Sequence, residues 1–343
     1  MPRNDTNLQV RLKSRPVGVP EAEHFELVRE PVGEPGVGQV LIRIAFVAVE
    51  PAMRGWVNAA ANYAQPVAIG AVMKSYAVGR IVASRSPLWK EGELVTGLFG
   101  WQQWALVDAG AIERRLDPAL LGPLPLSAAL GVLGLNGVTA YFGLLEVGQP
   151  RPGQTVVVSS GAGSVGSCVG QIAKLAGCRT VAIAGGAQKV ALARERFGFD
   201  AAVDYKAEGF EAALRGACPN GVDIYFDNTS GPISDAVAAL INIRARLVIC
   251  GTVAHTNWDP PPLGPRVERR LMVTRSRMEG FVAPDYQHRW DEAYRQLARW
   301  LQQGHIQVVE DVLDGLEQAP GSIAGLYRGE NLGKRVIRVA DGI

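Results

Sequence analysis

The sequence predicts an α/β protein in which a β-rich region precedes a doubly wound parallel sheet. Two observations predict this class: β-branched and aromatic runs punctuated by Gly and Pro fill the chain before about residue 125, and short strands alternate with helices from residue 155. A third, the stretch SSGAGSVGSCVG at 159–170, places three glycines where a strand passes into a helix. The 343 residues, 48% of them apolar, are enough for two packed cores.

The β-rich region contains three strand-like runs, QVLIRIAFVAVEP (39–51), AVGRIVAS (77–84) and ELVTGLFGWQQWALV (93–107). Together they predict a twisted sheet or small barrel. The apolar stretch 128–148 is interrupted by Asn136 and by four internal glycines, which makes it a poor membrane span. We interpret it as buried core helices.

The alternating region begins with the strand 155–160 and a helix over 164–176 whose apolar residues fall on one face. Strand, helix and turn patterns then follow one another, which is typical of a parallel doubly wound sheet. The predicted elements are strands at 180–185, 201–205, 222–228 and 246–251, and helices at 189–198, near 233–242 and at 290–304. A last strand at 333–340 could return to the first domain.

Charge and cysteine usage exclude several functions. The 35 basic and 33 acidic residues give a net charge of +2, too small for a nucleic-acid footprint. The four cysteines have no close-spaced pair, so neither a disulfide framework nor a Cys-rich zinc lobe is indicated. The first sixteen residues have no apolar core typical of a signal peptide. We therefore expect a soluble, cytoplasmic protein with no nucleic-acid or membrane partner.

The glycine turn is predicted to bind a dinucleotide. Gly161 allows a tight turn after the strand, Gly163 lets the backbone approach a pyrophosphate, and Gly166 lets the helix pack closely on the strand. The free N–H groups of the helix N-terminus favour the phosphates. The alternative is a tight turn with no ligand, because a glycine-rich chain also produces such spacings by chance.

The end of the next strand favours NADP(H) over NAD(H). An NAD site needs Asp or Glu there for the ribose 2′-hydroxyl, whereas this chain has Ala184, Gly185 and Gly186. Lys189 lies where its ammonium group could pair with a 2′-phosphate, although it could also be a solvated surface lysine.

No metal site and no catalytic triad can be assembled from the sequence. The N-terminal region has a single histidine, His24, and no cysteine, so it lacks ligands for a catalytic zinc. The other histidines are scattered, and none is placed beside a Ser and an Asp in a recognisable pattern. We predict that no metal takes part.

Blocks along nearly the whole chain resemble the zinc-free branch of the medium-chain dehydrogenases/reductases. They include VEPAMRGW, GLNGVTAYFGLLEVG, VVVSSGAGSVGSCVGQIAKLAGC, GVDIYFDN, MEGFV and NLGKRVIRV, in order and at matching spacing. They are most similar to the leukotriene B4 12-hydroxydehydrogenase or prostaglandin reductase type, with the bacterial curcumin reductases and plant alkenal double-bond reductases. The resemblance implies a GroES-like β domain (1–128 and 312–343), a Rossmann NADP-binding domain (129–311) and a homodimer.

The resemblance also implies an activity, the NADPH-dependent reduction of the carbon–carbon double bond of enones and enals, and a cofactor site. Lys189 matches the family's contact to the 2′-phosphate, Tyr205 matches another of its cofactor contacts, and Asn228 and Asn331 match the asparagines that hold the cofactor. The full expected cofactor set is Gly161, Ala162, Gly163, Ser164, Val165, Gly166, Gly186, Lys189, Tyr205, Asn228, Cys250, Phe281, Val282 and Asn331.

The substrate residues depart from the family pattern. Ala52 and Thr256 stand where the family commonly has tyrosines, while Ser75 and Tyr76 replace a glycine pair. The candidate donors to a substrate oxygen are Tyr76, Tyr63, Thr256 and the ribose hydroxyl of the cofactor, and each side chain could equally be plain pocket lining. Two alternatives to an enone reductase stay open, a quinone reductase of the same superfamily and an NADPH-binding sensor with little catalysis.

Overall fold

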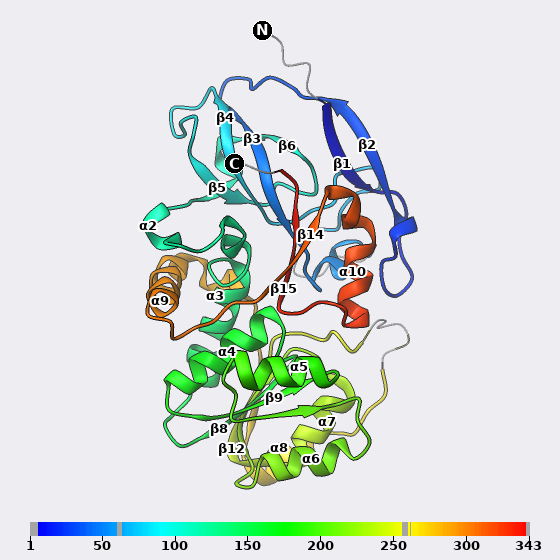
Figure 1. The fold of residues 1–343 in the computed structure, drawn as a ribbon. Helices are drawn as coiled ribbons and strands as arrows, with labels where there is room; N and C mark the ends of the chain where they lie inside the picture. The colour runs from blue at the N-terminus through cyan, green and yellow to red at the C-terminus, as the bar shows by residue number, and fades with distance from the viewer. Residues whose placement is uncertain (1–5, 60–63, 256–259, 261, 341–343) are drawn as a thin grey trace. The chain divides into compact units, whose positions relative to one another are not determined.

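The computed structural model describes residues 6–59, 64–255, 260 and 262–340. The chain divides into two compact units, each with its own sheet (Figure 1). The first unit comprises Met1–Leu130, Glu310–Asn331 and Arg335–Ile343, and the second Gly131–Val309 and Leu332–Lys334.

The first unit is built on a mostly antiparallel sheet around the long strand β3 (Gln39–Ala48). Nine of its ten residues are shielded from solvent at least in part, and Val40, Ile42 and Ile44 are fully buried. Such runs of β-branched residues pack well inside a sheet covered on both faces. The strands follow the order β14-β15-β3-β4-β5-β7, with β6 also paired to β3: β4 (Ala77–Ser84), β5 (Leu94–Gly97), β6 (Trp104–Asp108), β7 (Ile112–Arg115), β14 (Glu310–Asp314) and β15 (Lys334–Arg338).

The last strand returns to this sheet, as the sequence suggested. In β15, Val336 pairs with Ala48 and Ile337 with Val47, and both residues of β15 are fully buried. A separate two-stranded ribbon, β1 (Thr6–Leu12) and β2 (Phe25–Pro31), and the helices α1 (Met53–Trp56), α2 (Pro118–Leu121) and α10 (Ala319–Arg328) complete the unit.

The second unit contains a six-stranded sheet whose pairs are all parallel, in the order β10-β9-β8-β11-β12-β13. Helices pack along it, α4 on β8 and β9, α6 on β10, and α8 on β12 (Figure 1). This arrangement confirms the predicted doubly wound sheet. The strands are β8 (Thr155–Ser159), β9 (Arg179–Ala184), β10 (Ala201–Asp204), β11 (Val222–Asp227), β12 (Ile241–Ile249) and β13 (Arg277–Gly280). The helices are α3 (Leu135–Phe142), α4 (Ser164–Leu175), α5 (Ala187–Ala191), α6 (Phe210–Ala217), α7 (Gly231–Ala238), α8 (Glu268–Thr274) and α9 (Trp290–Gln302).

The apolar stretch 128–148 forms buried helices, as predicted. Val138, Ala140 and Phe142 of α3 are fully buried, and a π-helical segment, Gly143–Gly148, continues the helix. Among the described residues, no helix combines the length and the apolar character that a membrane crossing requires.

One predicted boundary is wrong. The sequence suggested a helix near 233–242, but α7 ends at Ala238 and Ile241 already pairs with Val222 as the first residue of β12. The register of β12 against β11 then shifts, and Arg244 adopts a positive φ of 62°. This irregularity interrupts the alternation of apolar and polar residues, so the first part of β12 does not show in the sequence pattern, whereas its second part falls within the predicted strand 246–251.

Candidate active site

The residues predicted to bind the cofactor follow the carboxyl ends of four neighbouring parallel strands. In the order β9-β8-β11-β12, these ends lead into Gly185, the glycine turn at 160–163, Asn228 and Cys250. Ligands of open α/β sheets bind outside the carboxyl ends of the strands. The topology of the second unit therefore brings together residues that lie far apart in the sequence.

The glycine turn joins the fully buried strand β8 to helix α4. A Cβ placed on Gly166 would lie 2.2 Å from the carbonyl oxygen of Ser160, and one on Gly161 would lie 2.6 Å from Cβ of Ala182. At Gly163 the nearest such atom is 3.2 Å away. Gly161 and Gly166 are thus packing glycines, whereas Gly163 leaves the backbone open to a close ligand.

Ser164 and Val165 open α4 just after this turn, and Ala162 is buried beneath it. The amide of Ser167 is the first along the helix to bond an earlier carbonyl, at 2.9 Å to Gly163. The amides of the first turn therefore face outward from the helix end, where they favour an anion such as a pyrophosphate.

The end of β9 carries no acidic side chain at the position that an NAD site requires. A Cβ on Gly185 would lie 2.8 Å from Cε1 of Tyr205 and 3.1 Å from Cε of Lys206, so these side chains lie directly against the glycine. The nearby acid is Asp204, and its Oδ1 accepts hydrogen bonds from the amides of Gly186 at 2.8 Å and Lys206 at 2.9 Å. These amides hold the carboxylate at the turn.

Two lysines stand near this strand end. Lys189 is partly buried in α5, three residues after Gly186, whose φ of 90° begins the helix. Lys206 carries an ammonium group 6.0 Å from the centroid of the Tyr205 ring, and Tyr205 is 42% exposed. Lys189, Lys206 and Tyr205 fit an adenosine 2′-phosphate. The two lysines offer positive charge, the tyrosine ring offers a stacking surface, and the end of β9 itself carries no acidic side chain that would repel the phosphate. Lys206 was missed from the sequence; its place directly after Tyr205 could have indicated it.

Asn228 follows β11 and is held by Ser159 at the end of β8. The Asn228 amide N–H donates to Oγ of Ser159 at 2.8 Å, and its Nδ2 donates to the Ser159 carbonyl at 2.7 Å. Ser159 is fully buried and Asn228 is 9% exposed. The asparagine is thereby fixed across two neighbouring strands.

Asp227 organises this turn from inside the unit, although the sequence analysis did not single it out. Its buried Oδ1 accepts from the amides of Thr229 at 2.9 Å and Ser230 at 2.8 Å and from the Tyr225 hydroxyl at 3.0 Å. Its Oδ2 accepts from Oγ of Ser234 at 2.5 Å. The carboxylate caps the loop before α7 and so fixes the position of the adjacent asparagine.

Cys250 is linked to Asp227 by a main-chain hydrogen bond. Its amide donates to the carbonyl oxygen of Asp227 at 2.8 Å. Burial of the thiol, with the negative charge of Asp227 as a lesser cause, raises the pKa of Cys250 to about 12. The thiol is therefore neutral near pH 7 and forms an uncharged wall.

Phe281 and Val282 follow β13, the edge strand beside β12. The ring of Phe281 meets Phe226 edge-on at 6.2 Å, and a Cβ on Gly143 would lie 2.3 Å from Cζ of Phe281. The absence of a side chain at Gly143 makes room for this ring, which fixes the start of the segment that contains Val282.

The candidate substrate residues are less completely placed. Tyr76 precedes β4; its carbonyl accepts from the Ala48 amide and the Ser75 hydroxyl, both at 2.8 Å. Its partly buried ring and Ala52 both pack at the edge of the same apolar cluster of the first unit. Tyr63 and Thr256 lie outside the described residues.

Asn331 lies in the first unit, two residues after the end of a turn that closes α10. Gly329, at φ 77°, ends the helix, and the Glu330 amide donates to the Gly325 carbonyl at 3.0 Å. Gly333, two residues further on, already belongs to the second unit, where it forms an isolated parallel bridge with Gly163 of the glycine turn.

Within the part of the chain that the structure describes, no group of three or more His, Cys, Asp or Glu side chains is placed to hold a metal ion. The four cysteines carry free thiols. The donor groups found around the strand ends are amides, hydroxyls and lysines, which suit an anionic nucleotide.

Comparisons with known proteins agree along the chain. The N-terminal domain of oxidoreductases matches residues 8–114, and a family described as zinc-binding dehydrogenase matches residues 164–300. The NADPH-dependent curcumin reductase of Escherichia coli is 43% identical over 96% of this chain and 96% of its own length. A 2-alkenal reductase (NADP⁺-dependent) of Nicotiana tabacum is 35% identical over 98% of each.

The fold is also shared with a solved structure. CurA from Vibrio vulnificus in complex with NADPH superposes with a TM-score of 0.91 and is 40% identical, covering 98% of this chain and 100% of that one. Sequence and structure thus point to one group of proteins across both units.

Proposed function

This chain belongs to the medium-chain dehydrogenase/reductase family, among its NADP-dependent oxidoreductases, and on that premise we propose that it reduces the carbon–carbon double bond of α,β-unsaturated ketones and aldehydes. The observation that carries the proposal is the end of β9, where Tyr205 and Lys206 lie against Gly185 and the residues Ala184, Gly185 and Gly186 include no acid. The names of the relatives, a curcumin reductase and a 2-alkenal reductase, support the conjugated acceptor.

The proposed cofactor residues divide into three tasks. The turn from Gly161 to Gly166 takes the pyrophosphate on its amides, and Lys189 with Tyr205 takes the 2′-phosphate end. Asn228, Cys250, Phe281, Val282 and Asn331 hold the remainder of the nucleotide. The residues Ser159 and Asp227 keep Asn228 in place.

The bound cofactor would supply a hydride to the β-carbon of the acceptor. Negative charge then collects on the carbonyl oxygen, and a hydrogen-bond donor aimed at that oxygen lowers the barrier. We propose Tyr76 as that donor, with Thr256, Tyr63 or a ribose hydroxyl as the alternatives. The α-carbon takes its proton from solvent or a nearby acid.

Three further features belong to the proposal. The domains are 1–128 with 312–343 and 129–311, and the hydride transfer needs no metal.

The protein forms a homodimer; the exposed residues Met272, Val273 and Met278, the last of them on the edge strand β13, offer a surface for a second copy. Light scattering that gave the mass of one chain, 36.6 kDa, would contradict the dimer.

Steady-state oxidation of NADPH against a panel of acceptors tests the activity. We expect turnover with enones and enals, saturated ketones or aldehydes as products, and no turnover with saturated carbonyl compounds. Faster reduction of quinones than of any enone would favour a quinone reductase. Tight NADPH binding without turnover of any acceptor would favour a sensor.

A further inference from the structure

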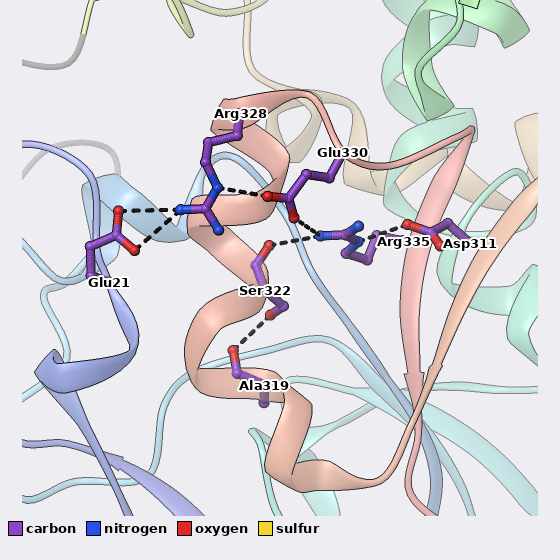
Figure 2. Close-up of polar contacts among 7 residues, drawn as sticks. All are labelled: Glu21, Asp311, Ala319, Ser322, Arg328, Glu330 and Arg335. Atoms are coloured by element: carbon purple, nitrogen blue, oxygen red, sulfur yellow. Dashed lines mark hydrogen bonds and ion pairs between the residues drawn. The ribbon is translucent and has the colours of Figure 1, made fainter. Parts of the chain in front are cut away.

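A cluster of ion pairs in the first unit includes the two residues, Glu330 and Arg335, that flank the segment 331–334 in the chain. We call it the Arg335 cluster; it consists of Glu21, Asp311, Arg328, Glu330 and Arg335 (Figure 2). Its members come from the loop before the first 3₁₀ turn, from β14, from the end of α10, from the loop after it and from β15. Apart from Arg335 and Asp311, they are about half exposed.

Arg335 is the buried centre of this cluster, with a side chain only 7% exposed. Its Nε donates to Oδ2 of Asp311 at 2.8 Å, and its Nη1 reaches the Ser322 carbonyl at 3.5 Å and lies 3.8 Å from Oε2 of Glu330. A buried guanidinium group is expensive unless it is paired in a defined geometry. These partners therefore fix where the planar group lies.

Glu330 stands between two arginines. Its Oε1 accepts from Nε of Arg328 at 2.6 Å, while its Oε2 faces Arg335. The hydrogen bond from Arg328 lowers the pKa of the Glu330 carboxyl, so the side chain is ionised near neutral pH. Arg328 also forms an ion pair with Glu21, in which Nη1 of Arg328 lies 3.3 Å from Oε2 of Glu21 (Figure 2).

The two ends of the segment 330–335 are thus tied to each other and to α10. Glu330 directly precedes Asn331, and the amide of Glu330 donates a hydrogen bond to the carbonyl oxygen of Gly325. At the other end of the segment, Arg335 is the second residue of β15. Gly325 itself leaves space for the pair, because a Cβ there would lie 2.3 Å from Nη1 of Arg335 and 2.5 Å from Oε2 of Glu330.

We propose that Glu330, held between Arg328 and Arg335, is a positioning residue that fixes the main chain at Asn331 and thereby sets how tightly the protein holds NADPH. This inference rests on the proposed function, in which Asn331 contacts the cofactor. A cluster that only stabilised the fold would change unfolding but leave NADPH affinity unaltered.

The primary test is Glu330→Gln, which keeps the size of the side chain and removes its charge. We expect the Kd and KM for NADPH to rise about fivefold, with kcat within about twofold of the parent, since two partly exposed ion pairs are weakened. The matched control is Asp314→Asn, which removes an ion pair between β14 and β15, the strands that also carry Asp311 and Arg335: Asp314 Oδ1 lies 3.3 Å from Nη1 of Arg338. This control should leave NADPH binding unchanged.

A second variant, Gly325→Ala, separates positioning from stability. The added methyl group would displace the ends of Glu330 and of the buried Arg335 rather than backbone, and so would disturb their ion pair. We therefore expect both the melting temperature and the NADPH affinity to fall. A purely structural role would lower the melting temperature but leave the NADPH affinity of the folded protein unchanged.

A double-mutant cycle with Asn331→Ala distinguishes the inference from its premise. If Glu330 acts through Asn331, Glu330→Gln weakens NADPH binding no further in the Asn331→Ala background. Additive losses, or a Glu330→Gln variant indistinguishable from Asp314→Asn, would overturn the positioning role alone. If Asn331→Ala by itself left NADPH binding unchanged, Asn331 would not contact the cofactor as proposed, and the positioning role of Glu330 would be wrong as well.

Discussion

The proposed cofactor edge of the second unit, formed by the carboxyl ends of β9, β8, β11 and β12, and the candidate substrate residues of the first unit are positioned in different ways. At the cofactor edge, parallel strands end side by side, and Ser159, Asp204 and Asp227 hold the following residues through main-chain hydrogen bonds. Tyr76, in contrast, is fixed by its own carbonyl, and its ring lies at the edge of an apolar cluster.

This difference shows which part of the site can vary. A nucleotide held by amides and strand ends depends on topology, which few side-chain changes disturb. A substrate wall made of rings on loops can be reshaped residue by residue, as the departures at Ala52, Ser75 and Tyr76 suggest. We therefore expect substitutions on the two sides to separate catalysis from cofactor binding.

The largest expected effect is on the substrate side. Tyr76→Phe should lower kcat by about 10² to 10³, or about 2.7 to 4 kcal/mol, because it removes the proposed donor to the enolate oxygen. NADPH affinity, measured by titration, should stay as in the parent. A rate within about threefold of the parent would make Tyr76 a wall residue and leave the donor role to Thr256, Tyr63 or the ribose.

The preference for NADPH over NADH should depend on Lys189. The protein should prefer NADPH over NADH at least tenfold, and Lys189→Ala should weaken NADPH binding about ten- to a hundredfold while changing NADH binding little. Lys174→Ala is the control, because Lys174 pairs with Asp200 at 2.9 Å elsewhere in the same unit. Equal affinities of the parent for both nucleotides would contradict the 2′-phosphate site.

The two kinds of glycine in the turn should behave differently. Gly166→Ala places a methyl group against the Ser160 carbonyl and should lower the free energy of unfolding by about 1–3 kcal/mol. A Cβ on Gly163 would lie 3.2 Å from the Ser160 carbonyl oxygen, a tight contact that a small shift relieves, so Gly163→Ala should cost less unfolding free energy than Gly166→Ala while NADPH binding weakens at least tenfold. Chemical denaturation and NADPH titration measure both; a Gly163→Ala variant as destabilised as Gly166→Ala would contradict this division.

No effect is expected from removing metal ions. Prolonged dialysis against a strong chelator should leave the rate of NADPH-dependent reduction unchanged, because the proposed reaction relies on hydrogen-bond donors rather than a Lewis acid. Loss of activity that only zinc restores would place the protein in another branch of its family.

The fold class and the glycine turn could be predicted from the sequence because both leave local signals. A buried strand, three spaced glycines and an amphipathic helix follow one another within the stretch 155–175. The helix predicted near 233–242 extends too far because its end depends on a contact that is not local. Ile241 pairs with Val222 of the neighbouring strand, and the local sequence pattern does not indicate this pairing.

The positioning groups could not be found in this way. Asp227 looks like one polar residue at the end of a strand, and its role depends on donors at Ser234 and Tyr225 that only the folded turn brings to it. The Arg335 cluster joins Glu21 to residues about 300 positions later in the chain. Charged residues spread so widely look like ordinary solvated surface in a sequence.

The pairing of β15 with β3 also affects the order in which the two units can fold during synthesis. All six strands of the parallel sheet are made before β15, whereas β3 is made early and stays without this neighbour until the parallel sheet has been synthesised. The edge of β3 that pairs with β15, Phe46–Ala48, is left unpaired for that time and is a template for pairing with other chains. Slow translation, or a delay before the final strand, should therefore raise aggregation of the nascent first unit while the second unit completes its sheet.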